Sequence, residues 1–102
     1  MRVITQHAHR AFKNRKPFSS RNTKVVIEDG EARMYLHDNL IAKTENGELF
    51  ISDGGYGTSN TTRERLNGFS QVWLYISKGE WMINRKKAWD GEWTNVIEFE
   101  DI

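Results

Sequence analysis

The stretch TKVVIEDGEARMYLH, residues 23–37, decides the fold because it contains a complete β-hairpin. Residues 25–27 are three β-branched side chains in a row, and this composition favours a strand. Asp29 and Gly30 follow, and this dipeptide is typical of a tight hairpin turn whose two central residues both need a positive φ. Apolar and polar residues then alternate along 31–37, as they do on a strand with one buried face.

The hairpin is the first half of a predicted four-stranded meander. Its strands, 23–28 and 31–37, are followed by a break at Asp38-Asn39 and by two further strand-like segments, 40–44 and 48–53. The sequence ENG joins the last two segments and is a second strong hairpin signal. Residues 23–53 are therefore expected to form four consecutive antiparallel strands.

A short helix is predicted before the meander. Apolar side chains at i, i+4, i+7 and i+8 from Ile4 to Phe12 form one helical stripe. Pro17 cannot continue a helix, so we expect a polar loop over 14–22. Because so short a helix is marginal alone, it must dock on the rest of the protein.

A second helix is predicted near 61–68. Thr61 as N-cap and Glu64 three residues later match the capping box, and Gly68 fits the residue that closes a helix. The preceding sequence DGGYGT, residues 53–58, could cradle a phosphate at the helix start, but it lacks the lysine of a P-loop. Glycines in a turn that needs positive φ explain it better.

The segment 71–77 is the strongest strand candidate and is apolar on both faces. Val72, Leu74 and Ile76 share one face, and Trp73 and Tyr75 share the other. A second, aromatic-rich sheet face is therefore expected. It is either covered by a helix or free to bind a partner.

Two more strands, 81–85 and 95–99, complete the predicted fold. The fold class is α+β, with an antiparallel sheet of about six or seven strands and two short helices. We expect a single domain over 1–102, with a basic helix-and-loop arm at 1–22 and the sheet, with its helix, at 23–102.

Charge is distributed unevenly along the 102 residues. Residues 1–24 contain seven Lys or Arg and no acid, whereas the rest of the chain is net acidic, and the whole chain is +1. Such asymmetry is a reason to consider a nucleic-acid or acidic partner. There is no cysteine, which excludes disulfides, thiolate metal sites and thiol catalysis.

No segment suggests a membrane or an export signal. No apolar run approaches the roughly 18 residues that cross a bilayer, and the N-terminus lacks the apolar core of a signal peptide. We expect no membrane association and a soluble, reducing, cytoplasmic setting.

Catalysis is not expected. His7 and His9 would point to different sides of a helix, and His37-Asp38 stands alone. Metalloprotease, paired-carboxylate and nucleophile-elbow motifs are absent from the sequence. We expect a non-enzymatic protein with no metal and no cofactor.

Two kinds of binding function remain open. Tryptophan, tyrosine and arginine dominate protein interfaces, so the first is a protein-binding module or a homodimer. Its candidate contact residues are Tyr35, Trp73, Tyr75 and Trp81, with Arg63 and Arg65 as a polar rim.

The second possibility is a single-stranded nucleic-acid binder, in which cations follow phosphates and aromatic rings stack on bases. All four tryptophans lie within residues 73–93. The candidate basic residues are Arg10, Lys13, Arg15, Lys16, Arg21, Lys24, Arg85, Lys86 and Lys87.

Three segments resemble a group of small proteins of tailed bacteriophages: AF…KPFS…NT from Ala11, YLHDNLIA from Tyr35, and GYGT…TTRERLN from Gly55. The similarity extends over about residues 8–95 and carries over no catalytic residues. It implies a small, early, non-virion product in the host bacterial cytoplasm. Such proteins often bind and disable a host protein, so the resemblance implies a role in host takeover or anti-defence.

Overall fold

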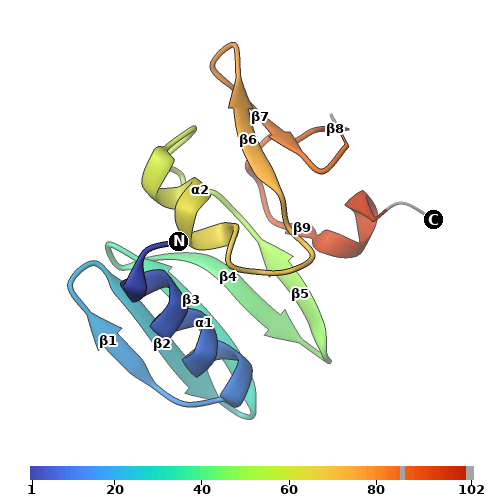
Figure 1. Cartoon of the computed structure of the whole chain (residues 1–102). Helices are drawn as coiled ribbons and strands as arrows, with labels where there is room; N and C mark the ends of the chain where they lie inside the picture. The colour runs from blue at the N-terminus through green and yellow to red at the C-terminus, as the bar shows by residue number, and fades with distance from the viewer. Residues whose placement is uncertain (86, 101–102) are drawn as a thin grey trace.

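The computed structural model describes residues 1–85 and 87–100 and has the predicted α+β fold (Figure 1). In the described part, the strands form two antiparallel sheets instead of the single sheet expected. The large sheet has the order β1-β2-β3-β4-β5-β9, and the small sheet has the order β6-β7-β8.

The strands of the small sheet lie in the sequence between the first five strands of the large sheet and its last strand. The strands of the large sheet are β1 (Phe18–Ser20), β2 (Thr23–Glu28), β3 (Glu31–Leu36), β4 (Asn39–Glu45), β5 (Glu48–Ile51) and β9 (Thr94–Asn95). Those of the small sheet are β6 (Leu74–Ser77), β7 (Glu80–Ile83) and β8 (Lys87–Ala88). The helices are α1 (Val3–Asn14), α2 (Asn60–Leu66) and the 3-10 helix η1 (Val96–Phe99).

The hairpin that decides the fold forms as predicted. β2 and β3 pair with Val25 opposite Met34, and both of these side chains are buried on the same face of the sheet. The turn residues Asp29 and Gly30 have φ values of 53° and 79°, the left-handed pair that this turn requires. The next turn uses His37 and Asp38, one residue before the predicted break, with φ values of 49° and 67°.

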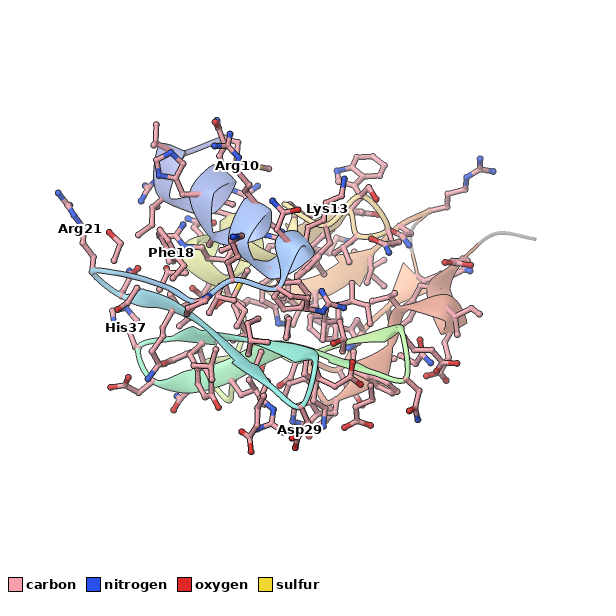
Figure 2. All side chains as sticks on the ribbon, turned by 90° about the horizontal axis from the view of Figure 1, so that it is seen from below. Arg10, Lys13, Phe18, Arg21, Asp29 and His37 are labelled. Atoms are coloured by element: carbon pink, nitrogen blue, oxygen red, sulfur yellow. The ribbon has the colours of Figure 1, made fainter. Side chains whose placement is uncertain are left out.

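α1 lies across one face of the large sheet, and no helix of the described residues covers the other face (Figure 2). The helix buries Thr5, Ala8 and Phe12 against the sheet. The predicted polar loop after it contains a strand, β1, in which Phe18 pairs opposite Val25. The N-terminal segment is thus part of the folded body and not a free arm.

The second helix begins differently from the prediction. Ser59 is its N-cap, because the Ser59 hydroxyl accepts a hydrogen bond from the Thr62 amide at 3.2 Å. Glu64 closes no capping box. Its carboxylate accepts a 3.0 Å bond from the backbone amide of Arg2, where α1 begins.

Gly68 does not have the left-handed conformation that was expected of it. Its φ lies outside that region, and the helix ends at Asn67 with an αR backbone. A Cβ at position 68 would collide with the imidazole ring of His9, whose Nε2 lies 2.6 Å from the carbonyl oxygen of Arg65. Since the Arg65 carbonyl can only accept, His9 carries its proton on Nε2. Glycine is needed here for the close approach of α1.

The C-terminal strands are shorter than predicted. The Asn67 side chain bonds both the amide and the carbonyl of Leu74, at 2.6 and 2.9 Å, and β6 begins only at Leu74. The predicted strand 95–99 is a two-residue strand followed by η1, because the Asn95 side chain caps the amide of Ile97.

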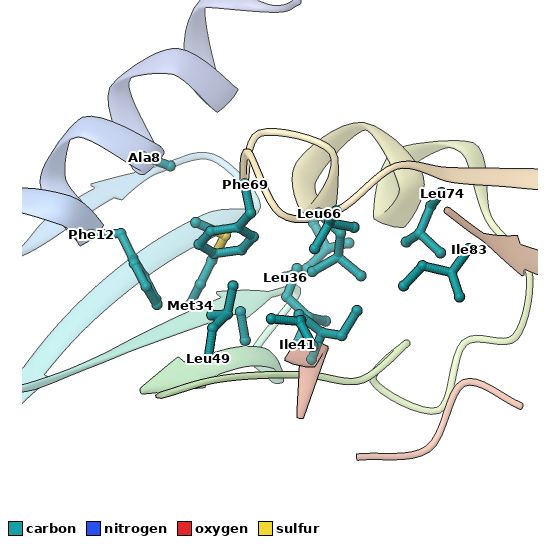
Figure 3. Close-up of a cluster of buried hydrophobic side chains, with 14 of the residues drawn as sticks. Ala8, Phe12, Met34, Leu36, Ile41, Leu49, Leu66, Phe69, Leu74 and Ile83 are labelled. Carbon is teal, nitrogen blue, oxygen red and sulfur yellow. The ribbon is translucent and has the colours of Figure 1, made fainter. Parts of the chain in front are cut away.

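One hydrophobic core joins the helices and both sheets (Figure 3). Ala8 and Phe12 of α1 face Met34 and Leu49 of the large sheet, and Phe69 packs edge-on against Phe12. The core continues through Leu36, Ile41 and Leu66 to Leu74 and Ile83 of the small sheet.

Arg65 lies inside this structure and is only 2% exposed. Its guanidinium donates to Thr23 Oγ1 on β2 at 2.8 Å, to Thr5 Oγ1 on α1 at 2.9 Å and to Asn22 Oδ1 at 3.3 Å. Desolvation by burial lowers the pKa of this group below its ordinary value. Arg65 therefore ties α2 to α1 and to the large sheet.

The contact between α1 and α2 predicts a pH-dependent stability. Burial lowers the pKa of His9, and the bond to the Arg65 carbonyl and the charge of Glu64 only partly oppose this. Folding therefore favours neutral His9, and its contribution is complete above the unfolded pKa of about 6.5 and is lost as the pH falls below that value. We expect the free energy of unfolding, measured by urea denaturation, to be lower at pH 5.5 than at pH 7.5.

The variant His9→Gln should show a smaller loss between these two pH values, because it removes the titrating group. His7→Gln is the matched control, since His7 is exposed on the same helix. An equal loss in His9→Gln and in the wild type would contradict this explanation.

Candidate interaction surfaces

The small sheet has one face with exposed apolar side chains. Trp73 is 64% exposed, and its ring lies 5.7 Å from that of Tyr75 between centroids. Met82 pairs opposite Tyr75 across β6 and β7 and is half-buried. We call Trp73, Tyr75 and Met82 the aromatic face.

The backbone beneath the aromatic face is held firmly. Asn84 accepts a hydrogen bond from the Trp73 amide through its side chain at 2.9 Å, and its own amide donates to the Trp73 carbonyl at 2.8 Å. The same side chain donates to the carbonyls of Gln71 and Phe99. The backbone of Trp73 is therefore tied by hydrogen bonds to Asn84.

Trp81 does not belong to a contact surface, so that prediction is wrong. Trp81 is 4% exposed because it pairs opposite Ile76 and shares the buried face of the small sheet. Its indole N–H donates to Asp53 Oδ2 at 3.2 Å, and its ring packs on that of Trp89. Asp53 also bonds the Gly55 amide, so this carboxylate links the end of the large sheet to the small sheet.

The prediction that Arg63 and Arg65 form a polar rim is wrong for Arg65. Arg65 is buried, as described above, and cannot form a rim. Arg63 is half-buried on α2. Sequence reasoning missed Met82 and Asn84, although the alternation along the return strand from Trp81 places Met82 on the face opposite to Trp81.

Tyr35 lies elsewhere, on the helix-free face of the large sheet. The Lys24 ammonium lies 5.0 Å from the centre of the Tyr35 ring, and Lys43 covers Trp93 in the same way at 4.7 Å. The cations of this face are paired with acids: Lys24 with Asp38, Arg33 with Glu28, and Lys43 with Glu45. This face therefore neutralises its own charge.

A second surface is basic and is formed by α1 and the segment after it. Arg10, Lys13, Lys16 and Arg21 are exposed, and none of them takes part in an ion pair with any described residue. Figure 2 shows Arg10 and Lys13 on the side of α1 that points away from the sheet. We call these four residues the basic helix surface.

The other basic residues that were predicted to act together are dispersed. Arg15 turns back to the carbonyls of Phe12 and Gly30, at 2.7 and 3.1 Å. Lys24 is on the opposite face of the sheet. Arg85 and Lys87 belong to the small sheet region, and Lys86 lies outside the described residues.

The glycine-rich loop after β5 is a turn, as the sequence favoured. Gly54, Gly55 and Gly57 all have φ values between 70° and 84°. Asp53 Oδ1 accepts from the Gly55 amide, which folds the loop back on itself. The phosphate-loop alternative receives no support from this geometry.

An acidic cleft of about 750 Å³ lies between the small sheet and η1. Its charged lining residues are Asp53, Glu80, Asp90 and Glu98, and its apolar floor contains Trp81 and Trp89. Among the described residues, Arg10, Lys13, Lys16 and Arg21 form no ion pair with the acids of this cleft.

None of the helices in the described part of the chain is long and apolar enough to cross a bilayer.

These observations define a small α+β protein with an exposed aromatic face and an exposed basic surface, and the comparison with known families gives its origin. The family model described as "Kyanoviridae Gp96 protein" matches residues 1–100, so the chain belongs to this phage family. This confirms that it is a phage protein, as the sequence resemblance implied. No curated protein and no solved structure matches the chain.

The different burial of two tryptophans predicts different effects on stability. Trp81→Ala should lower the free energy of unfolding by about 3–5 kcal/mol, because it leaves a cavity and an unpaired Asp53 oxygen. Trp73→Ala should cost about 1 kcal/mol or less, since it removes only an exposed ring stacked on Tyr75. Urea denaturation of both variants measures this, and equal losses would contradict the assignment of Trp73 to the surface.

Proposed function

We propose that this phage protein is a non-enzymatic accessory protein that binds and modulates a host bacterial protein in the host cytoplasm, in host takeover or in anti-defence. The observation that supports this most directly is the aromatic face, where Trp73 is 64% exposed beside Tyr75 and Met82. The phage family membership accounts for a bacterial host.

The composition of the aromatic face is that of an interface core. Trp, Tyr and Met are enriched where proteins bind one another, and charged side chains are depleted there. Trp and Tyr bury large areas with few rotatable bonds, so ordering them costs little entropy. Because hydrogen bonds to Asn84 already hold the Trp73 backbone, binding a partner costs less conformational entropy there.

Affinity capture from a lysate of host bacteria tests the proposal. Tagged wild-type protein, Trp73→Ser and Trp93→Ser are compared, and bound proteins are quantified by mass spectrometry. Trp93 is the matched control because it is also exposed, at 40%, but lies on the large-sheet side under Lys43. We expect one host protein to be recovered with the wild type and Trp93→Ser, and at least about tenfold less of it with Trp73→Ser.

Two results would contradict the proposal. The first is equal recovery of the partner by all three proteins. The second is a dimer in sedimentation velocity that grows with concentration and disappears in Trp73→Ser, because a second copy of the chain would then cover the aromatic face.

A second candidate function is binding of single-stranded nucleic acid, and the basic helix surface is the observation that favours it. Its four cations are exposed and form no ion pair with a described acid. Arg10 and Lys13 lie on the docked helix α1, Lys16 lies in the loop after it, and Arg21 lies in the turn between β1 and β2. Neutralising phosphates would release counterions, so the affinity would fall as salt rises.

Fluorescence anisotropy with a labelled single-stranded oligonucleotide at two salt concentrations tests this second function. We expect Arg10→Gln with Lys13→Gln to weaken binding and to reduce the salt dependence by about one to two released ions. Lys24→Gln with Lys43→Gln is the control, because both lysines are ion-paired on the other face of the sheet. Binding that is equally weakened by both double variants, or no binding at all, would exclude the basic helix surface as a nucleic-acid site.

A further inference from the structure

A groove of about 450 Å³ lies where α1 begins, between that helix and the turn from β1 to β2. Its polar lining residues are Arg2, His7, Ser20, Arg21, Asn22 and Arg65. None of the acidic residues that the structure describes lines this groove. The groove is therefore lined by positive charge and by hydrogen-bond donors.

The wall of this groove contains a buried charge with no acidic contact. Arg65 is 2% exposed, and within the described residues its guanidinium donates to the neutral oxygens of Thr5, Thr23 and Asn22. Among the described residues, no carboxylate oxygen lies within ion-pair distance of it. A guanidinium has five N–H groups, so these three bonds leave donors available.

Glu64, the acid next to Arg65 in the sequence, forms no ion pair with it. Glu64 interacts electrostatically with Arg65, but its carboxylate is bonded to the Arg2 amide and to Thr5. Buried cations are normally paired with an anion, because removing a charge from water is costly. Arg65 therefore has no carboxylate in direct contact, and its charge adds to the positive potential of the groove.

The remaining groups around the groove are suited to an anion. Asn22 Oδ1 accepts from Thr23 and Arg65, which leaves the Asn22 amide N–H₂ to donate. Ser20 adds a hydroxyl, and Arg2 and Arg21 are exposed at the same groove. The N–H groups of a guanidinium match the geometry of phosphate oxygens. Three guanidinium cations suit the double negative charge of a phosphate better than the single charge of a carboxylate.

We propose that this groove binds a phosphate group, with Arg65 as its buried contact and Arg2 and Arg21 as its exposed contacts. The phosphate is either free or the terminal phosphate of a nucleotide. This site is separate from the aromatic face, and Arg21 is the only residue that it shares with the basic helix surface.

Isothermal titration calorimetry and amide chemical shifts with three probes test the proposal: inorganic phosphate, 5′-AMP and adenosine. We expect saturable binding of at least one phosphate-bearing probe, no binding of adenosine, and shifts at residues 2, 7 and 20–22. Arg21→Gln and Arg2→Gln should each weaken binding about tenfold. Lys13→Gln should leave it within about twofold, because Lys13 is exposed on α1 but does not line the groove.

The same titrations separate the two sources of phosphate. Binding of 5′-AMP at least tenfold tighter than inorganic phosphate would assign the site to a nucleotide, and equal affinities would assign it to free phosphate. The proposal is overturned if neither phosphate probe binds, if adenosine binds as well as 5′-AMP, or if Lys13→Gln weakens binding as much as Arg21→Gln. The last result would indicate general attraction of anions to the basic helix surface.

Discussion

The buried guanidinium of Arg65 is the contact on which the arrangement of the helices depends. Its three acceptors come from α1, from β2 and from the turn before β2, so these three hydrogen bonds form together only when all of these elements are in place. Because a buried charge with missing partners is strongly destabilising, other packings of α1 and α2 on the sheet are penalised. One side chain thus selects a single arrangement and also leaves positive charge at the surface groove.

Local sequence signals predicted the central part of the fold well. The DG turn, the β-branched residues before it and the stripe on α1 act through neighbours in sequence, and all three features are present in the structure. The predictions were wrong where contacts between residues distant in sequence determine the secondary structure. β1 forms because Phe18 pairs opposite Val25 of β2. β6 begins three residues later than predicted, at Leu74, whose backbone is hydrogen-bonded to the Asn67 side chain. Nothing adjacent to these residues in the sequence indicates either contact.

The candidate surfaces could be predicted only in part, for two different reasons. Strand alternation separates Trp73 and Tyr75 from Leu74, but it does not indicate which face the core will cover. The position of Trp81, in contrast, follows from the two-residue turn Lys78-Gly79, which pairs Trp81 with Ile76 and so places it on the face of Leu74. The burial of Arg65 depends on acceptors from distant segments and has no local signature.

The late position of β9 in the sequence has a consequence for synthesis of the chain. β1 to β5 and α1 are made first and pair with close neighbours, so they can assemble as the chain emerges. The outer edge of β5 then has no strand beside it until Thr94 and Asn95 arrive. Unpaired strand edges invite pairing with other chains. The nascent protein therefore passes through a period in which its completed half is most exposed to aggregation, and the last strand ends that period.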